Sequence, residues 1–294
     1  MSFFLKLVYI KMDKINIITY NILSSKLADL MIAEIKDNKQ VYDSNNLNNN
    51  NRLEKIKQYL LEQIIKNYDL NLIICLQEVS EEWLPILANF FISNKYKYIN
   101  IQYGRVFNGN MGILIAYPDY LNIIKSEFYE IGKHIKVNSD NKLKASLKRN
   151  NAILLILENS NNNLQFGVTT YHMPCEPTNE YIGYYHSKKL YKKITKFMKN
   201  IKYWILAGDF NMLNHTKSYL YLISNCGCIW KDKLKKYPIT NHAYINGHEF
   251  AGCLDYIFYS KSLSCDDVKY KEINNIIPDN ENPSDHIPIL ASFN

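Results

Sequence analysis

Short apolar runs with polar residues at their ends recur along most of the chain, and their spacing predicts a strand-rich α/β protein. A run over 15–22 ends in a polar segment, and the continuous apolar run over 72–76 is typical of a strand buried on both faces. Further runs separated by Gly, Pro and Asn turns predict strands at 96–102, 112–117, 121–128, 152–158, 164–170, 203–207, 254–259 and 287–292.

Helical spacing of apolar residues alternates with these runs. Apolar side chains recur at Leu53, Ile56, Leu60 and Ile64, which predicts a helix over 52–66 after an Asn-rich loop at 44–51. Another helix is expected to begin at Ser80, a residue suited to an N-cap, and two more over 180–200 and 214–224. This order favours two sheets packed face to face with helices outside.

The domain organisation follows from the absence of any break in this pattern. No linker, composition shift or internal repeat divides the 294 residues, so we expect one domain over 14–294 preceded by an N-terminal extension over 1–13. No uninterrupted apolar stretch approaches the roughly 20 residues of a membrane span. The apolar start of the chain has no small-residue cleavage site, which makes it a poor signal peptide. We therefore expect a soluble intracellular protein, cytoplasmic or nuclear, without a membrane partner.

Composition and charge narrow the class of partner. With 47% hydrophobic and 21% charged residues the chain is of globular type, and its net charge of +7 stands beside 24 tyrosines. A basic surface interleaved with aromatic rings suits an anionic partner, nucleic acid first. The same bias toward Lys, Ile, Asn and Tyr also arises from nucleotide composition alone, so charge by itself does not decide.

The six cysteines contain no C-x-x-C pair, and several lie in apolar runs. This pattern predicts reduced core thiols in a reducing compartment. The Cys226-Gly227-Cys228 segment is a weak zinc signal, because a zinc site needs a second ligand pair at suitable spacing.

The segment 206–212 carries the clearest chemistry. Asp209 and Asn211 follow the predicted strand over 203–207, with Gly208 expected to open the turn. Ligands of α/β proteins bind at the carboxyl ends of strands. An Asp that takes a proton from water and an Asn that donates to an oxyanion suit hydrolysis. The alternative is structural, because an Asp after a strand is often only the N-cap of the next helix.

Five further polar signals occur in the same context, at or beside a predicted strand end. Each has its own structural explanation, such as a solvated acid before a helix, a hydrogen-bonded histidine before proline, or a turn. Together they favour one site at one edge of the sheets. These signals are Asn21, Glu78, His172, Asp255 and the segment Ser284-Asp285-His286.

The order and wording of these segments resemble the endonuclease/exonuclease/phosphatase superfamily, which includes pancreatic deoxyribonuclease, abasic-site endonucleases, inositol polyphosphate 5-phosphatases and carbon-catabolite-repressor type deadenylases. The resemblance runs from about residue 14 to the end of the chain and depends on Gly-Asp-Phe-Asn at 208–211, Leu-Asp-Tyr-Ile-Phe at 254–258 and Ser-Asp-His at 284–286. It implies a four-layer α/β/β/α sandwich of two mixed β-sheets flanked by helices, and divalent-metal-dependent hydrolysis of phosphoesters.

The resemblance also implies a metal site. Glu78 matches the principal Mg²⁺ ligand of the family, with Mn²⁺ as a substitute, and Asn21 matches a residue that supports the metal or its water. Asp285 would reach the metal or fix the terminal turn. Mg²⁺ prefers oxygen ligands and is held by one or two carboxylates together with substrate phosphate, which agrees with this donor set.

The remaining matches surround the scissile phosphate. Asp209 matches the residue that orients or deprotonates the attacking water, and Asn211 one that hydrogen-bonds the phosphoryl group. His172 and His286 match two histidines that stabilise charge on its oxygens. Asp255 would hold His286 in one tautomer. Whether His286 is base, acid or charge stabiliser stays open at this point.

Three positions bear on the branch of the family. Leu23 stands where abasic-site endonucleases carry an acidic residue, which argues against that branch. Pro177 and Phe250 match a Pro and a Phe that pack around adenine in the deadenylase branch, although Phe250 also suits ordinary core packing. Asn151 is a candidate phosphate or sugar contact. The sequence Tyr-His-Met-Pro at 171–174 differs from the motif that is usual in that branch. The leucine-rich repeats that often precede its catalytic domain are also lacking.

The sequence thus predicts a Mg²⁺-dependent nuclease or phosphodiesterase, most similar to 3′ to 5′ exoribonucleases of the deadenylase type, with RNA favoured over DNA. One alternative is a phosphatase acting on a phosphoinositide or another small phosphoester. The other is a catalytically silent nucleic-acid binding module on the same fold. No protein partner is predicted.

Overall fold

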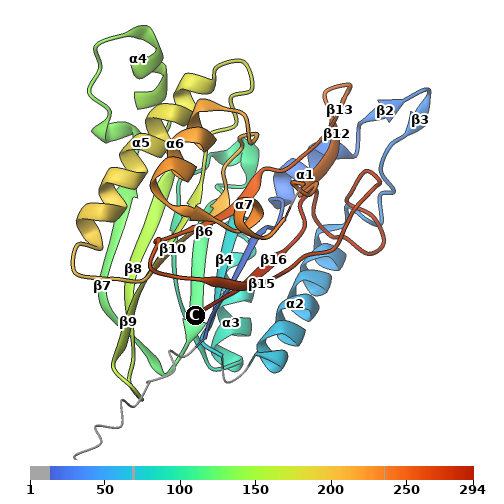
Figure 1. The fold of residues 1–294 in the computed structure, drawn as a ribbon. Helices are drawn as coiled ribbons and strands as arrows, with labels where there is room; N and C mark the ends of the chain where they lie inside the picture. The colour runs from blue at the N-terminus through green and yellow to red at the C-terminus, as the bar shows by residue number, and fades with distance from the viewer. Residues whose placement is uncertain (1–13, 68–69, 235) are drawn as a thin grey trace, which may run out of the picture.

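The strands form two six-stranded mixed sheets in the computed structural model, which describes residues 14–67, 70–234 and 236–294 (Figure 1). The expected extension over 1–13 lies outside the described residues. The first sheet has the order β15 (Cys265–Lys269), β16 (Ile289–Phe293), β1 (Ile15–Asn21), β4 (Leu72–Val79), β6 (Gly112–Pro118), β5 (Tyr96–Gln102). The second has the order β11 (Gly227–Cys228), β14 (Asp255–Tyr259), β10 (Trp204–Asp209), β9 (Leu164–His172), β8 (Asn151–Asn159), β7 (Leu121–Glu130).

Helices cover the outer faces of both sheets. The α-helices are α1 (Ser25–Met31), α2 (Asn49–Lys66), α3 (Leu84–Ser93), α4 (Asp140–Ser146), α5 (Glu180–Phe197), α6 (Lys217–Asn225) and α7 (Ile229–Lys233), and two 3₁₀ turns are η1 (Val106–Asn108) and η2 (Gly132–His134). Buried side chains of α2 and α3 share a core with the first sheet, and those of α5 and α6 pack on the second. The predicted four-layer α/β/β/α sandwich is therefore confirmed.

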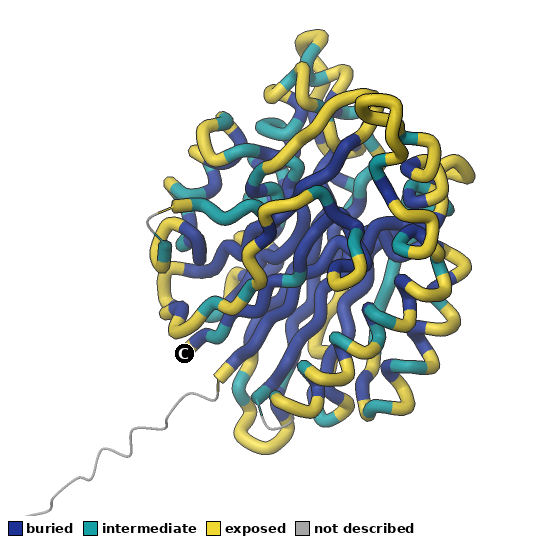
Figure 2. Tube along the Cα trace, turned by 90° about the vertical axis from the view of Figure 1, so that its right-hand side faces the viewer, coloured by how far each residue is buried: buried dark blue, intermediate teal, exposed yellow. Residues whose placement is uncertain are grey.

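The central strands β1 and β4 of the first sheet are buried on both faces, as their continuous apolar runs predict (Figure 2). In β1, Ile15 and Ile17 belong to the core between the two sheets, whereas Ile18 and Tyr20 belong to the core under α2 and α3. This alternation is the two-residue period of a strand. Each strand therefore joins two layers of the sandwich at once.

A chain of hydrogen-bonded polar side chains crosses between the two sheets near the carboxyl ends of β1, β4, β9 and β10. The Thr19 hydroxyl donates to Gln77 Oε1 at 3.2 Å, and Gln77 Nε2 donates to Thr170 Oγ1 at 3.0 Å. The Thr170 hydroxyl then donates to the Ala207 carbonyl oxygen at 3.1 Å. Because buried polar groups cost free energy unless paired, this chain favours one alignment of the two sheets. It therefore aligns the ends of β1, β4, β9 and β10.

Two predicted boundaries are wrong by a few residues. Helix α2 begins at Asn49, inside the predicted loop, because the Asn48 side chain caps it by accepting from two backbone amides. Helix α3 begins at Leu84 rather than at Ser80. The Ser80 hydroxyl instead accepts from the Ser25 backbone amide at 2.8 Å, which attaches α1 to the end of β4.

Several short elements have no counterpart in the sequence prediction. They include α1, α4, α7, β11 and β15, and the two hairpins β2 (Ile35–Lys36) with β3 (Lys39–Gln40) and β12 (Asn241–Ile245) with β13 (His248–Gly252). These elements have two to seven residues each, which is too few for a hydrophobic periodicity to be recognised. The two hairpins contact each other through the Lys36–Glu249 ion pair, at 2.6 Å.

The sequence predicts no membrane-spanning segment and reduced cysteines in the core, and the described residues bear on both predictions. Within them, no helix combines the length and the apolar character that a membrane crossing requires. The six cysteines are free, and all except Cys175 are buried.

A buried histidine joins α5 to its neighbours. His186 Nε2 lies 2.9 Å from the carbonyl oxygen of Ala145 in α4, and a carbonyl oxygen only accepts, so Nε2 carries the proton. Nδ1 therefore accepts from the Tyr171 hydroxyl of β9 at 2.6 Å. Burial lowers the pKa of His186 to about 4. The neutral ring is thus fully paired and ties α4, α5 and β9 together.

We predict that His186 makes the protein acid-sensitive. Its pKa is lower in the folded state than the usual 6.5, so the unfolded chain binds more protons and stability falls as pH falls from about 6.5 to about 4. Between pH 7 and pH 5, urea unfolding should show that His186→Gln loses about 2 kcal/mol less stability than the unsubstituted protein does. The exposed His248→Gln should leave the pH dependence unchanged. Equal losses in all three proteins would contradict this assignment.

Candidate active site

The strand ends bring distant polar residues to one edge of the sandwich. Asn21 ends β1, His172 ends β9, and Asp209 ends β10. β1 pairs in parallel with β4, and β9 with β10, so their carboxyl ends meet. β14 runs antiparallel to β10 with Asp255 opposite Asp209, which places its first residue at the same edge.

A β-bulge aims Glu78 into the site. The register of β4 on β6 shifts between Gln77 and Val79, and the intervening Glu78 has a φ of 58°. Left-handed backbone at a residue other than glycine is strained and tends to occur at functional sites. Glu78 Oε2 accepts from the Ser24 amide at 3.0 Å, which fixes the carboxylate.

Asn21 connects two carboxylates that belong to different sheets. Its Nδ2 donates to Glu78 Oε1 at 2.9 Å and to Asp209 Oδ2 at 3.0 Å. Its Oδ1 accepts from the Leu23 amide at 3.0 Å. In this arrangement the amide orients both carboxylates, and its oxygen is already engaged away from them.

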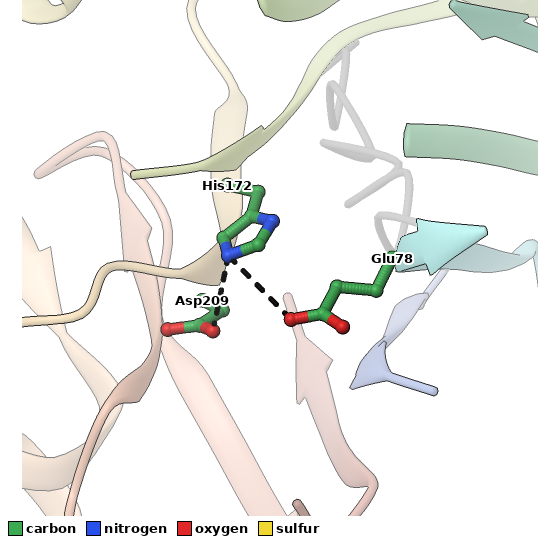
Figure 3. A group of neighbouring side chains, drawn as sticks. All are labelled: Glu78, His172 and Asp209. Carbon is green, nitrogen blue, oxygen red and sulfur yellow. Dashed lines mark ion pairs between the residues drawn. The ribbon is translucent and has the colours of Figure 1, made fainter. Parts of the chain in front are cut away.

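His172 lies between the same two carboxylates (Figure 3). Its Nε2 is 3.5 Å from Asp209 Oδ2 and 3.9 Å from Glu78 Oε1. On the other side of the ring, Nδ1 lies 2.7 Å from the hydroxyl of Tyr103. Burial and the charges of Glu78 and Asp209 raise the pKa of Tyr103 well above its usual value, so its hydroxyl stays protonated.

Asn211 lies beside His172 and is fixed by its own backbone. It has a φ of 44°, and its amide N–H donates to Asp209 Oδ1 at 2.9 Å. Its Nδ2 donates to the Met173 carbonyl oxygen at 3.0 Å and lies 3.2 Å from His172 Nε2. The carboxamide therefore faces the same corner as both carboxylates.

Asp255 and His286 form a buried pair. His286 Nδ1 donates to Asp255 Oδ2 at 2.7 Å, so Nε2 faces the site, 3.7 Å from Asp209 Oδ2. Burial raises the pKa of Asp255 to about 6, although the charge of His286 opposes this. Burial lowers the pKa of His286, but the charges of Asp255, Asp209 and Asp285 outweigh it and raise the pKa well above its usual value.

Asp285 is held beside the pair rather than in it. Its Oδ2 accepts from Asn241 Nδ2 at 3.3 Å. Burial raises its pKa, against the lowering effect of His286. The neighbouring Ser284 hydroxyl donates to the Asn21 carbonyl oxygen at 2.8 Å, which attaches this loop to the end of β1.

One guanidinium connects the backbone segments that carry the site. Arg52 of α2 is 1% exposed; its Nε donates to the Pro283 carbonyl oxygen at 2.6 Å, and an Nη donates to the carbonyl oxygens of Ile22, at 2.7 Å, and Leu23. Its guanidinium also lies 5.1 Å from the ring of Trp83, which follows β4. The charge therefore fixes the loops that bear Asn21 and His286, near the strand that bears Glu78.

Two groups of side chains among the described residues are close enough to share a metal ion. One is Glu78, His172 and Asp209, and the other is Asp209, Asp255 and His286. In the second group Asp255 and His286 already bond each other. Glu78 and Asp209 are buried carboxylates bridged by the neutral amide of Asn21, and their negative charge suits a divalent cation. The first group therefore fits the metal better. Neither group includes Asp285 or a cysteine.

The structure changes the interpretation of Gly208. It lies inside β10 rather than in a turn, and a Cβ there would come within 1.9 Å of the Tyr171 carbonyl oxygen. The glycine is thus required for close approach of β9 and β10. Asp209 caps no helix either, since the next helix, α6, is capped by Thr216.

A cleft of about 1440 Å³ opens above these side chains. Pro177 and Phe250 both line it, and Phe250 is 38% exposed on β13, outside the hydrophobic clusters of the described residues. Among the described residues, the lining includes Asn150 but not Asn151, whose Nδ2 donates to the Arg149 carbonyl oxygen at 2.9 Å. Phe250 is therefore not a core residue, and Asn151 is turned away from the cleft.

The sequence analysis missed Arg52 and Tyr103. Arg52 did carry a signal, since it lies four residues before Ile56 and eight before Leu60, on the buried face of the helix. Tyr103 follows β5 with no such signal.

Comparison with known proteins agrees with the fold. The model of the Endonuclease/Exonuclease/phosphatase family matches residues 18–286, and the chain belongs to this family. It is accordingly a metal-dependent phosphoester hydrolase, with a buried cluster of acidic and histidine side chains. No curated protein sequence matches the chain.

Several solved structures share the fold. The catalytic domain of human Nocturnin with bound sulfate is 20% identical, with 96% of this chain and 93% of that chain covered and a TM-score of 0.69. ANGEL2, a 2′,3′-cyclic phosphatase in complex with adenosine-2′,3′-vanadate, is 17% identical, with coverages of 96% and 95% and a TM-score of 0.76. TDP2 of D. rerio with a single-strand DNA product is 15% identical, with coverages of 96% and 99% and a TM-score of 0.64.

We predict that Arg52 is required for stability. Arg52→Met leaves three buried carbonyl oxygens without their donor, and a hydrogen bond to a charged group contributes about 1.5–3 kcal/mol. Urea unfolding should show a loss of about 3 kcal/mol or more. Lys66→Met, at the exposed end of the same helix, should change stability by less than about 0.5 kcal/mol. A loss of that small size for Arg52→Met would contradict the assigned role.

Proposed function

We propose that the protein is a Mg²⁺-dependent phosphodiesterase that cleaves single-stranded RNA, most similar to 3′ to 5′ exoribonucleases of the deadenylase type. The observation that carries this proposal is the buried group of Glu78, Asp209 and His172, which lies in the same cleft as Pro177 and Phe250. A single ligand bound in this cleft would contact both the hydrolytic side chains and the exposed ring of Phe250.

Glu78 would hold the metal, and Asp209 would stay free to act on the water beside it. The oxygens of Glu78 are of the kind that Mg²⁺ prefers, and Mn²⁺ is expected to replace it. When bound, the ion supplies neutralisation of charge on the phosphoryl oxygens. Asn21 keeps the two carboxylates in register through its two hydrogen bonds. Asp285, which accepts from Asn241, would fix the loop that carries His286.

The protein's own groups would divide the remaining work around the phosphate. Asp209 orients the attacking water and accepts its proton, since its Oδ2 points into the corner between both histidines. Asn211, His172 and His286 present N–H groups to the phosphoryl oxygens as negative charge grows. Tyr103 and Asp255 are positioning residues, because each bonds the far nitrogen of one histidine ring.

The substrate class rests on Phe250 and Pro177. A half-exposed ring beside a hydrolytic centre can stack on a base, and such stacking contributes about 1–3 kcal/mol per base. ANGEL2 and Nocturnin share the fold, and the ANGEL2 structure holds an adenosine derivative. A strand that ends in a 2′,3′-cyclic phosphate is the second candidate substrate, since the same platform would hold its terminal base.

The extent of the catalytic domain and the cellular compartment are also part of the proposal. Residues 14–294 would act as one catalytic domain, since β16 at the end of the chain pairs with β1 at its start. An intracellular site of action, cytoplasmic or nuclear, is supported by the six free cysteines.

The first prediction concerns Asp209. Asp209→Asn keeps the shape of the side chain but cannot accept the proton of water, so RNA hydrolysis in Mg²⁺ should fall at least about 100-fold. Excess chelator should abolish the activity of the unsubstituted protein, and added Mg²⁺ or Mn²⁺ should restore it. The unfolding midpoint of the variant should not fall, because one of several adjacent negative charges is removed. Turnover that survives either treatment would refute the proposed chemistry.

The second prediction concerns Phe250 and the identity of the substrate. Poly(A), mixed RNA, single- and double-stranded DNA, abasic DNA, inositol phosphates and an RNA ending in a 2′,3′-cyclic phosphate are compared with Mg²⁺ present. Poly(A) should be preferred, and Phe250→Ala should raise KM for RNA about tenfold with a smaller change in kcat.

The control for that comparison is Phe128→Ala, which removes a similarly exposed ring on β7 away from the cleft. Its kinetics should match those of the unsubstituted protein. Equal cleavage of duplex DNA, or a preference for inositol phosphates, would count against the RNA assignment. Preference for the cyclic phosphate end would favour the second candidate.

A further inference from the structure

A lysine cluster lies on the face formed by α4 and α5, outside the hydrolytic site. It consists of Lys136, Lys142, Lys189 and Lys192. Lys189 and Lys192 are three residues apart on α5 and so share one face of the helix. Burial lowers the pKa of Lys189, and the charges of Lys192, Lys136 and Lys142 add to this effect. Among the described residues none of the four has a carboxylate partner, whereas Lys133, Lys148, Lys193 and Lys217 nearby all do. Uncompensated positive charge is therefore concentrated here.

Tyrosine rings are interleaved with these lysines. Tyr184 and Tyr185 lie 5.5 Å apart between ring centroids, and Tyr181 lies 6.4 Å from Tyr185. Lys142 Nζ lies 5.5 Å from the Tyr185 ring, and Lys188 Nζ lies 5.7 Å from the Tyr184 ring. None of these rings is fully buried. The face thus places lysine ammonium groups directly beside aromatic rings.

The lysine cluster is continuous with the wall of the cleft. Lys144, Lys148 and Arg149, at and just beyond the end of α4, line the cleft. Ala145 and Ile182 pack together beneath them, and His186 bonds the Ala145 carbonyl oxygen. Helices α4 and α5 therefore pack against each other (Figure 1), so the lysine cluster and the basic side chains of the cleft wall lie on or beside the same pair of helices.

We propose that this lysine cluster, with Tyr181, Tyr184 and Tyr185, is a second binding surface for single-stranded nucleic acid and holds the part of the substrate that extends beyond the cleft. Phosphates relieve the repulsion among the four lysines and release counterions. Bases stack on the tyrosine rings without regard to sequence. The continuity with the cleft favours a nucleic acid strand over an anionic membrane. This inference rests on the proposed function, because it assumes that the cleft takes such a strand.

The test compares long and short strands. In the triple variant Lys136→Glu, Lys189→Glu, Lys192→Glu, the affinity for an RNA of about 20 nucleotides, measured in chelator to prevent cleavage, should fall at least tenfold. The slope of log K against log salt should become shallower by about 2, because each phosphate contact to a single strand contributes about 0.7. Cleavage of an RNA of about 4 nucleotides should be unchanged. The neutral triple variant with Gln in place of Glu should lose part of the affinity.

A matched control carries the same change in net charge elsewhere. Lys66→Glu, Lys95→Glu, Lys269→Glu alters exposed lysines at the end of α2, before β5 and in β15. It should keep full affinity for the long strand. Melting temperatures of all three triple variants verify that they are folded.

Each outcome decides between the alternatives. Equal affinity of the folded Glu and Gln triple variants and the unsubstituted protein for the long strand would overturn the second surface while leaving the proposed function intact. Failure of the unsubstituted protein to bind or cleave any nucleic acid would instead overturn the proposed function. Binding to anionic vesicles that is lost in the triple variant, with RNA affinity unchanged, would assign the lysine cluster to a membrane and refute the inference.

Discussion

Four carboxylates are buried in one corner of the sandwich, and the surrounding structure is arranged to make this possible. Glu78, Asp209, Asp255 and Asp285 are each at most 8% exposed. Carboxylates at such separations repel each other strongly where water is excluded. Burial, which removes these groups from water, raises the pKa of Asp255 and of Asp285, and the neighbouring charge of Asp209 adds to this effect. Without compensating groups the chain would have to protonate these acids or open the corner to water.

The compensation comes from three sources that belong to different parts of the chain. The amide of Asn21 supplies two hydrogen bonds, the guanidinium of Arg52 supplies a buried positive charge, and His286 supplies a proton to its hydrogen bond with Asp255. A divalent cation would complete this set, because it neutralises more charge than any side chain present. Stability and metal affinity are thus properties of the same group of residues.

Sequence alone predicted those parts of the fold and site that local patterns encode. Strands β1, β4 and β8 are long apolar runs because both faces are buried, and the polar residues near the ends of β1 and β4 marked the edge where the site lies. Arg52 and Tyr103 were missed because their roles arise from contacts across 231 and 69 positions. The hairpin that carries Phe250 was missed because β13 is mostly exposed. The particular substrate follows from such loops, whereas the chemistry follows from the strand ends.

The two hydrogen bonds of Asn21 have a mechanical consequence. Its amide nitrogen connects the edge of one sheet to the edge of the other, so the hydrolytic centre lies on the seam between two halves of the molecule. A slip of one half by a fraction of an ångström lengthens one of these bonds before the hydrophobic interior is exposed. Catalytic activity therefore depends on how well the two sheets are aligned. Substitutions in the hydrophobic core that shift one sheet against the other can abolish activity while the protein is still folded.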